Sequence, residues 1–370
     1  MPDILAAVAR EPHQPLDFAH LQLAEPRPNE LVVEVRAAGI CHSDLSGRDQ
    51  LYPFPLPGVL GHEGVGIVRA IGSEVTAAKV GDRVVMSQAF CGECDSCLAG
   101  SVTACRYTTE LALKGSRKDG SSIISDGSGA QVSGAFLGQS SWATHAIVRE
   151  PNLALLPEGI PWEVAAPMAC GVQTGAGAIL NVLQPKASES VVVFGAGTVG
   201  LSAVMAAKHI GCEQIVVVDM LEGRLDLARE LGATHTVNPS TDDVVAAVHD
   251  ATGSGADFSV EASGARAAGP LAVDSLHGQG TCILLGTPPF GTKIELDWIG
   301  IVSGRTVLGA PFGGGTPTVT IGKLLDLRAA GALPVEKLVR TYPFADIEKA
   351  IADMESGATI KPVLLFDELD

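Results

Sequence analysis

The chain has 370 residues, 46% of them hydrophobic, so it is long enough for two globular domains and too apolar to be disordered. Its formal net charge is −17 and it contains no basic block, which argues against nucleic acid and anionic membranes as partners. The N-terminal residues lack a charged stretch followed by an apolar core, and glycine or proline interrupts the long uncharged runs. We therefore expect no signal peptide, no membrane-spanning segment and a cytoplasmic location.

Short β-like runs separated by glycine and proline fill the first 170 residues or so. Examples are residues 31–35, 65–70 and 83–86. Runs of this kind predict a mostly antiparallel, partly barrel-like domain.

Two groups of potential metal ligands within this part are far apart along the chain. Cys41 is followed by His42, Ser43 and Asp44, and His62 is followed by Glu63. A further cysteine, Cys170, stands alone. Two thiolates and one imidazole suit a zinc ion whose fourth position stays open for water or substrate. Spacing alone does not decide the matter, because a lone buried cysteine or histidine is usually part of a core.

A compact cysteine cluster lies between Glu63 and Cys170 along the chain. Its members are Cys91, Cys94, Cys97 and Cys105, with the spacing C-x2-C-x2-C-x7-C. Four thiolates within so short a segment fit one tetrahedral structural zinc. Two disulfides or a redox C-x-x-C are the alternatives, and neither a secretory signal nor a βαβ context supports them.

A dinucleotide-binding pattern follows in the second half of the chain. The apolar strand at 191–194 leads into G-x-G-x-x-G, and a helical run ends near residue 211. The motif glycines are Gly195, Gly197 and Gly200, with Thr198 and Val199 between them as further expected cofactor contacts. The glycines allow a tight turn, close approach of the backbone to a pyrophosphate, and close packing of helix on strand. The start of the helix offers free N–H groups and a positive dipole end to the phosphates.

An acidic residue completes this pattern at the end of the next strand. Residues 215–218 form a second buried strand that ends in Asp219. A carboxylate at this position accepts hydrogen bonds from the adenosine ribose and repels a 2′-phosphate. The pattern therefore predicts NAD rather than NADP.

The rest of the second half alternates between helical and strand-like runs. The helical runs are 223–231, 242–251 and 265–276, and the strand-like runs are 258–261, 282–285 and 306–308. This alternation predicts a doubly wound parallel sheet, a Rossmann domain, over residues 172–311. Helices near 319–330 and 345–355 and a strand at 362–366 follow. We expect this tail to return to the first domain, which then consists of residues 1–171 and 312–370.

The motifs together resemble the zinc-dependent medium-chain alcohol dehydrogenase family over essentially the whole chain. Gly61-His62-Glu63 with Gly66, Gly72 and Val75 is similar to the family's zinc signature G-H-E-x2-G-x5-G-x2-V. Within the family, the chain is most similar to aryl-alcohol (benzyl alcohol) dehydrogenases. That resemblance is carried by residues 41–45, 48–53, 138–141 and 173–177. It implies a mostly-β GroES-like catalytic domain beside the Rossmann coenzyme domain.

The resemblance also implies a role for each matching residue. Cys41, His62 and Cys170 would hold a catalytic zinc, and Glu63 would be a transient ligand. Asp44 would orient the His62 ring, and Ser43 would take the alcohol proton. Ser46 stands where many relatives have the histidine that ends a proton relay. Ser87 would border the substrate pocket, which Tyr52, Phe54 and Phe90 would help to line. Further contacts to the cofactor are implied for His42, Thr174, Arg224, Leu285, Ala310, Phe312 and Lys361.

The activity implied is reversible hydride transfer from an aryl or allylic primary alcohol to NAD, in a homo-oligomer with two zinc ions per chain. Dimer and tetramer stay open. One alternative is a thiol-adduct (S-hydroxymethyl) formaldehyde dehydrogenase of the same family, for which no arginine cluster is evident as an anchor. A non-enzymatic, dinucleotide-sensing protein is the other alternative. Loss of a catalytic ligand would signal such a protein, yet Cys41, His62 and Cys170 are all present.

Overall fold

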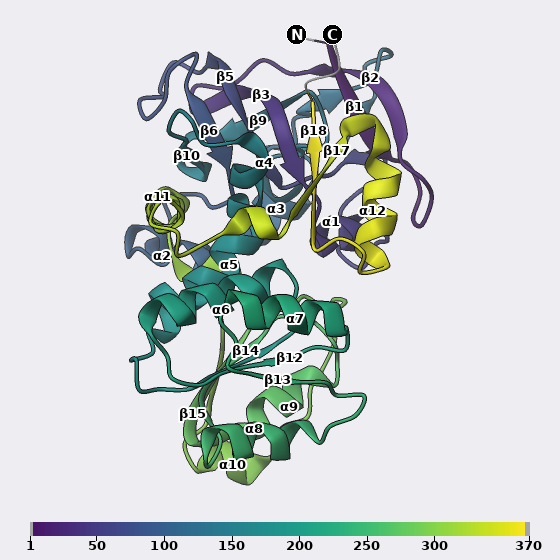
Figure 1. The fold of residues 1–370 in the computed structure, drawn as a ribbon. Helices are drawn as coiled ribbons and strands as arrows, with labels where there is room; N and C mark the ends of the chain where they lie inside the picture. The colour runs from purple at the N-terminus through teal and green to yellow at the C-terminus, as the bar shows by residue number, and fades with distance from the viewer. Residues whose placement is uncertain (1–2, 367–370) are drawn as a thin grey trace. The chain divides into compact units, whose positions relative to one another are not determined.

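A computed structural model describes residues 3–366, and they form two compact units (Figure 1). The first unit contains the residues up to Cys170, Thr316–Lys323 and the residues from Val335 onward. The second contains Gly171–Gly315 and Leu324–Pro334.

Two largely antiparallel sheets form the first unit. One consists, in spatial order, of β4 (Gly58–Val59), β1 (Asp3–Ala9), β2 (Asp17–Leu23), β7 (Ile124–Ser125) and β8 (Gln131–Val132). The other consists of β10 (Leu153–Leu155), β6 (Arg83–Met86), β5 (Glu63–Ile71), β3 (Glu30–Gly39), β18 (Lys361–Leu365) and β17 (Val339–Pro343), with β9 (His145–Arg149) also paired to β3. The mostly antiparallel fold predicted for this part is confirmed.

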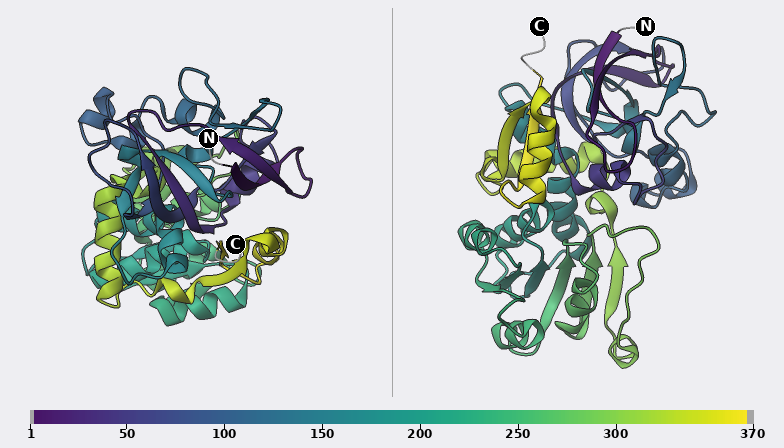
Figure 2. Two further views of the ribbon diagram at one scale, coloured as in Figure 1. Left: turned by 90° about the horizontal axis from the view of Figure 1, so that it is seen from above. Right: turned by 90° about the vertical axis from the view of Figure 1, so that its right-hand side faces the viewer.

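The C-terminal part of the chain completes the second of these sheets. Strand β18 pairs with β3 in antiparallel register, with Val363 opposite Gly39. Figure 1 labels these two strands side by side, and Figure 2 shows the yellow C-terminal part from two further directions. The helix α12 (Ile347–Glu355) buries Ile347, Ala350, Ile351 and Met354, the spacing of one apolar helix face. This pairing brings Lys361 to the end of β3, immediately before Cys41.

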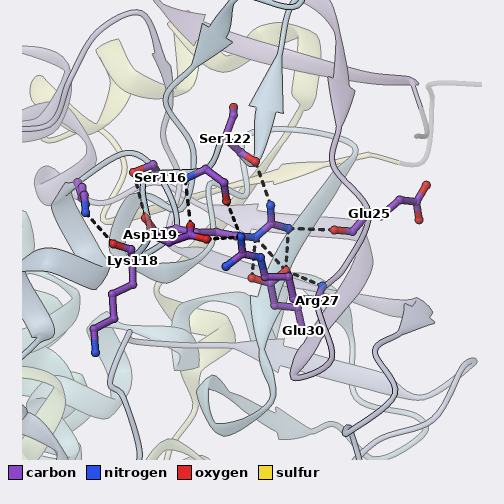
Figure 3. Close-up of polar contacts among 10 residues, drawn as sticks. Glu25, Arg27, Glu30, Ser116, Lys118, Asp119 and Ser122 are labelled. Atoms are coloured by element: carbon purple, nitrogen blue, oxygen red, sulfur yellow. Dashed lines mark hydrogen bonds and ion pairs between the residues drawn. The ribbon is translucent and has the colours of Figure 1, made fainter.

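A polar network fixes the segment after the cysteine cluster to the chain before β3. Arg117 donates to both carboxylate oxygens of Glu30 and to the backbone oxygens of Glu25 and Ser122, at 2.8–2.9 Å for the shortest bond to each. Arg27 donates to Asp119 at 2.6 Å. Figure 3 shows Arg27, Glu30 and Asp119 at the centre of these contacts. All three guanidinium nitrogens of Arg117 donate hydrogen bonds, which stabilises the buried ion pair that Arg117 forms with Glu30.

A single six-stranded parallel sheet forms the second unit. Its order is β13 (His235–Val237), β12 (Ile215–Val218), β11 (Val191–Phe194), β14 (Ala256–Glu261), β15 (Leu276–Leu284) and β16 (Thr306–Gly309). Strands β11 and β12 are runs of apolar residues buried on both faces, as parallel strands covered by helices must be. Helices α6 (Thr198–Ile210) and α7 (Glu222–Leu231) cover one face, and α8 (Val244–Thr252) and α9 (Ala268–Asp274) cover the other (Figure 1).

The strand order reverses between β11 and β14. The predicted doubly wound fold is thereby confirmed, and its ligand crevice is expected at the carboxyl ends of these two strands.

The unit boundaries differ from the predicted ones, since Gly171 and residues 312–315 lie with the second unit, and so does a part of the tail. The helix α11 (Pro317–Ala329) begins in the first unit and ends in the second, so residues 324–334 lie with the second unit. The sequence pattern placed all of 312–370 with the first. The sequence did not reveal this change, because the amino-acid composition of the helix is similar on both sides of the boundary. Leu324 and Leu333, in the part that lies with the second unit, are completely buried.

No single helix among residues 3–366 is long and apolar enough to cross a membrane. One bent pair, Trp162–Ala169 with Gly171–Leu183, has the length and composition of a broken span.

Candidate active site

The cysteine cluster is preorganised for one metal ion. The sulfur atoms of Cys91, Cys94, Cys97 and Cys105 all lie within 4.8 Å of one another. Cys97 Sγ is 3.6 Å from that of Cys94 and 3.7 Å from that of Cys91. Sulfurs about 2.3 Å from a central zinc would be about 3.8 Å apart in a tetrahedron, which matches these distances. A disulfide would need about 2.05 Å, so these cysteines are not paired in disulfides.

Backbone N–H groups point at the sulfurs of this cluster. Cys91 Sγ accepts from Cys94 N at 3.2 Å, and Cys105 Sγ accepts from Cys91 N at 3.3 Å. A hydrogen bond from the Arg106 N–H is the main cause that lowers the pKa of Cys94 to about 6, whereas burial raises the pKa of Cys97 to about 12. Four thiolates in this space need a cation, which a divalent metal supplies.

A second donor set is built from three separate segments of the first unit. Cys41 caps the short helix α1 (His42–Arg48) after β3, and His62 and Glu63 stand at the start of β5. Cys170 follows the turn η4 (Ala166–Ala169). The structure brings their ligand atoms within 4.8 Å of one another.

The Asp44 carboxylate organises this set. One oxygen accepts from His62 Nδ1 at 2.7 Å and from Gly61 N at 3.1 Å, and the other accepts from Cys41 N at 2.9 Å. Burial is the largest single influence and opposes protonation of His62, but the charge and the hydrogen bond of Asp44, with a smaller effect of neighbouring Cys41, together raise the His62 pKa.

The remaining ring nitrogen, His62 Nε2, is buried and has no hydrogen-bond partner among the described residues. A metal at this position would satisfy it, so the donor set fits a zinc ion held by two sulfurs and one nitrogen.

The two thiols of this set interact directly. Their shared hydrogen bond holds the pKa of Cys41 well below its usual value and raises that of Cys170. The charge of Lys361 also lowers the pKa of Cys41. A thiolate beside a thiol and an imidazole is an electron-rich centre that a divalent cation stabilises.

Glu63 and Lys361 form a buried ion pair beside these ligands. Lys361 Nζ donates to Glu63 Oε2 at 2.7 Å and to the backbone oxygen of Ile40 at 2.8 Å. Burial raises the pKa of Glu63 to about 7, against the opposing charge of Lys361. A Cβ at Gly39 would lie 2.0 Å from Glu63 Oε2, so this approach requires glycine. The expected contact of Lys361 with a cofactor phosphate stays a prediction.

The other first-unit candidates have different surroundings. On the first turn of α1, His42 is exposed and Ser43 is half-buried. Ser87 is completely buried, and its hydroxyl donates to the Ala169 backbone oxygen at 3.0 Å. The aromatic side chains of Tyr52, Phe54 and Phe90 are buried in hydrophobic clusters.

The glycine motif of the second unit has the geometry of a dinucleotide loop. Gly195 has a φ of 92°, and a Cβ there would lie 2.9 Å from Ser263 N, in the turn after β14. A Cβ at Gly200 would lie 1.8 Å from the Gly195 oxygen, so helix and strand are in backbone contact. At Gly197, no described residue other than the neighbours of Gly197 along the chain comes within 4 Å of such a Cβ. The loop therefore leaves backbone accessible at the start of α6.

Asp219 closes this loop. One of its carboxylate oxygens accepts from Ala196 N at 2.7 Å, and the other accepts from Leu221 N at 2.9 Å. Beside it lies a cavity of about 460 Å³, whose lining includes Phe194, Asp219 and Arg224. The buried Arg224 Nε has no partner among the described residues, so a cation faces the same region.

The remaining second-unit candidates lie on or directly after other elements of this unit. Thr174 is on α5 (Gly171–Gly177) and Leu285 directly follows β15. Ala310 directly follows β16, and Phe312 lies in the short helix η6 (Pro311–Gly314). Glu261 is a further functional candidate that was not predicted from the sequence. Its buried carboxylate accepts from Ser263 N and Gly264 N at 2.8 and 2.9 Å and so holds the turn that faces Gly195. Its position as an acidic residue at the end of the predicted strand 258–261 was the only feature of the sequence that could have indicated this role.

Two family models match the chain. The model described as an alcohol dehydrogenase GroES-like domain matches residues 27–158, and the model described as a zinc-binding dehydrogenase matches residues 198–328. A geraniol dehydrogenase from Castellaniella defragrans is 38% identical over 365 residues, which cover 98% of this chain and 97% of that protein. The chain belongs to the zinc-binding alcohol dehydrogenase family.

Two further members of the family are informative. The crystal structure of benzyl alcohol dehydrogenase from Acinetobacter calcoaceticus is 39% identical with a TM-score of 0.95, and the match covers 99% of this chain and 100% of that one. S-(hydroxymethyl)glutathione dehydrogenase from Saccharomyces cerevisiae is 31% identical, with 99% and 97% covered. As a member of this alcohol dehydrogenase family, the chain is an oxidoreductase, and the predicted GroES-like domain is confirmed.

The Asp44 network generates a direct prediction about metal affinity. Asp44→Asn keeps the shape of the side chain but removes the charge and one acceptor from three buried N–H groups. We expect zinc affinity at the Cys41–His62–Cys170 set to fall about 10- to 100-fold, measured by competition with a chelator. Asp126→Asn is the matched control, because Asp126 also accepts backbone N–H groups, in an exposed turn. An affinity within twofold of wild type in Asp44→Asn would contradict the assigned role.

Proposed function

We propose that this protein is a zinc- and NAD-dependent dehydrogenase that oxidises aryl or allylic primary alcohols to aldehydes. The observation that carries the proposal is the unpartnered, buried His62 Nε2 beside two thiols, in a chain that also has a complete dinucleotide loop. Three protein ligands and one open position are the pattern of catalytic rather than structural zinc.

The proposed zinc ligands fall into two sets. Cys41, His62 and Cys170 would hold a catalytic ion, with Glu63 adjacent, and the four cysteines from Cys91 to Cys105 would hold a structural ion. A zinc ion in the catalytic set supplies Lewis acidity, which makes a bound alcohol more acidic and polarises an aldehyde carbonyl.

The surrounding residues would act on protons and on orientation. Asp44 fixes the tautomer of His62, so that Nε2 rather than Nδ1 is the ligand atom. The Ser43 hydroxyl would accept the alcohol proton. Buried Lys361 balances the charge of Glu63 and, in part, that of the thiolates. The net reaction converts alcohol and NAD⁺ into aldehyde, NADH and one proton, and the hydride comes from the alcohol α-carbon.

Asp219 supports NAD as the cofactor. Its carboxylate stands beside the 460 Å³ cavity, where the ribose of a dinucleotide would lie at a switch point of this kind. The negative charge of Asp219 would repel the 2′-phosphate of NADP. Arg224 would border the same ribose, and the backbone at Gly197 and the start of α6 would hold the pyrophosphate.

The substrate class rests on two relatives. The relative named geraniol dehydrogenase and the one named benzyl alcohol dehydrogenase are 38% and 39% identical over nearly the whole chain. Both named substrates are primary alcohols whose carbinol carbon is next to a π-system.

The decisive assay measures NADH formation with benzyl alcohol, geraniol and ethanol at matched concentrations. We expect kcat/KM for benzyl alcohol or geraniol to exceed that for ethanol at least tenfold, and activity to disappear after chelation. A zinc-loaded protein that oxidises none of the three alcohols would contradict the proposal. S-(hydroxymethyl)glutathione would then be the next substrate to test.

Replacing NAD with NADP in the same assay tests the role of Asp219. A carboxylate facing the 2′-phosphate should lower kcat/KM with NADP by about tenfold or more, since 1.4 kcal/mol of repulsion corresponds to tenfold. Equal efficiency with both cofactors would contradict this role.

We also propose that the chain forms a homo-oligomer. In the second unit, the helix α10 (Trp298–Val302) exposes Trp298 by 80% and Val302 by 69%, and β16 lies at the edge of the sheet. Exposed apolar side chains next to a free sheet edge are typical of an interface between copies. Sedimentation should give the mass of two or four chains, and a monomer at micromolar concentration would contradict this.

A further inference from the structure

We propose that Gln139 is a positioning residue that sets the separation between the segments carrying His62 and Cys170. This inference rests on the proposed metal site and deepens it. Gln139 itself is not a ligand, and it acts through the backbone on either side of the metal-binding side chains.

The side-chain amide of Gln139 joins two strands at their site-facing ends. Its Oε1 accepts from Gly64 N at 3.0 Å, and its Nε2 donates to the His62 oxygen at 2.7 Å and to the Met86 oxygen at 2.9 Å. The residue is 1% exposed, so these bonds form away from water. A third carbonyl, that of Ser87, lies 3.5 Å from Nε2. One N–H and three carbonyls thus face the amide, and this pattern admits a single amide orientation.

A second bond extends this link to Cys170. Ser87 follows Met86, and its hydroxyl donates to the oxygen of Ala169, which precedes Cys170. Ser87 is completely buried. A path of hydrogen bonds and short backbone therefore runs from His62 through Gln139 and Ser87 to Cys170.

The turn that presents Gln139 has an unfavourable backbone. Ala135, Leu137 and Ser140 have φ values of 56°, 47° and 64°, in the left-handed region that residues with a Cβ rarely adopt. Such conformations persist only where the surroundings hold them, and they concentrate at functional sites. A Cβ at Gly138 would lie 2.9 Å from that of Ala89, so the turn also packs against the chain after β6.

Neighbouring contacts fasten this turn to the His62 segment. The Ser140 hydroxyl accepts from Phe136 N at 2.9 Å and donates to the Val59 oxygen at 2.6 Å. Ser141 N donates to the Gly61 oxygen at 2.9 Å. The turn thus lies along the chain that leads into His62, and Gln139 extends from there to β6.

Only an amide satisfies this position. An apolar residue would leave one buried N–H and three buried carbonyls without these bonds. Glutamate would keep the acceptor for Gly64 but would place a carboxylate against these carbonyl oxygens. Both changes should loosen the His62 and Cys170 segments while leaving the four-cysteine cluster intact.

The experiment measures zinc release to a chromogenic chelator from Q139E and Q139M. We expect one of the two zinc ions to leave at least about tenfold faster than in wild type, and the other at an unchanged rate. Q50E is the matched control, because Gln50 Nε2 also donates to two backbone oxygens, those of Gly47 and Phe54, in a more exposed turn. Its release rates should stay within twofold of wild type.

A spectroscopic signature separates positioning from general loosening. In the cobalt(II)-substituted protein, the visible bands of the three-ligand site should change in Q139E and stay unchanged in Q50E. Release rates and spectra like wild type in both Gln139 variants would overturn the proposal. If those variants do not fold, S87A decides: it removes one hydroxyl, and we expect about threefold faster release of the same ion. Unchanged release in S87A would then overturn it.

These readouts need no substrate. A wild-type protein that holds two zinc ions but oxidises no alcohol would refute the proposed function. The zinc release rates of the Gln139 variants would still decide whether Gln139 positions the metal ligands. A wild-type protein that holds zinc only in the cysteine cluster would refute both.

Discussion

The hydrogen bond between the Asp44 carboxylate and His62 Nδ1 is the interaction on which the site depends. Both groups are buried, and an isolated buried carboxylate would be strongly unfavourable. Asp44 is stabilised because it accepts three N–H groups, and those groups belong to the two segments that carry Cys41 and His62. The same bonds that stabilise the charge therefore aim Nε2 and align two of the three ligands.

The rest of the first unit holds the remaining members in place. Strand β18 carries Lys361 to the end of β3, where its charge balances Glu63 and favours the Cys41 thiolate. The Gln139 amide and the Ser87 hydroxyl connect the strand ends around His62 to the residue before Cys170. Buried Lys361 thus balances the charge of the site, whereas buried Gln139 and Ser87 set the spacing of its backbone segments.

Local patterns were sufficient to predict much of this molecule. The short spacing from Cys91 to Cys105 and the strand–glycine–helix order around Gly195 are encoded within a few dozen residues, and the structure has both geometries. Links between distant segments were not predictable in this way. No local pattern pairs Gln139 with His62 and Met86, or Ser87 with Ala169. The α11 boundary was missed for a related reason, since its helical periodicity continues while its neighbours change. The aromatic residues near the ligand segments, such as Phe54, are part of the core.

The most direct test of the account is zinc K-edge X-ray absorption of the purified protein, together with its zinc content. Two ions in the proposed sets, four cysteines in one and two cysteines with one histidine in the other, predict two zinc ions per chain. The average first shell should then contain about three sulfur atoms and about one nitrogen or oxygen atom per zinc. One zinc per chain with four sulfur ligands would show that Cys41, His62 and Cys170 do not hold a metal. The orientation of His62 by Asp44 would then need another explanation.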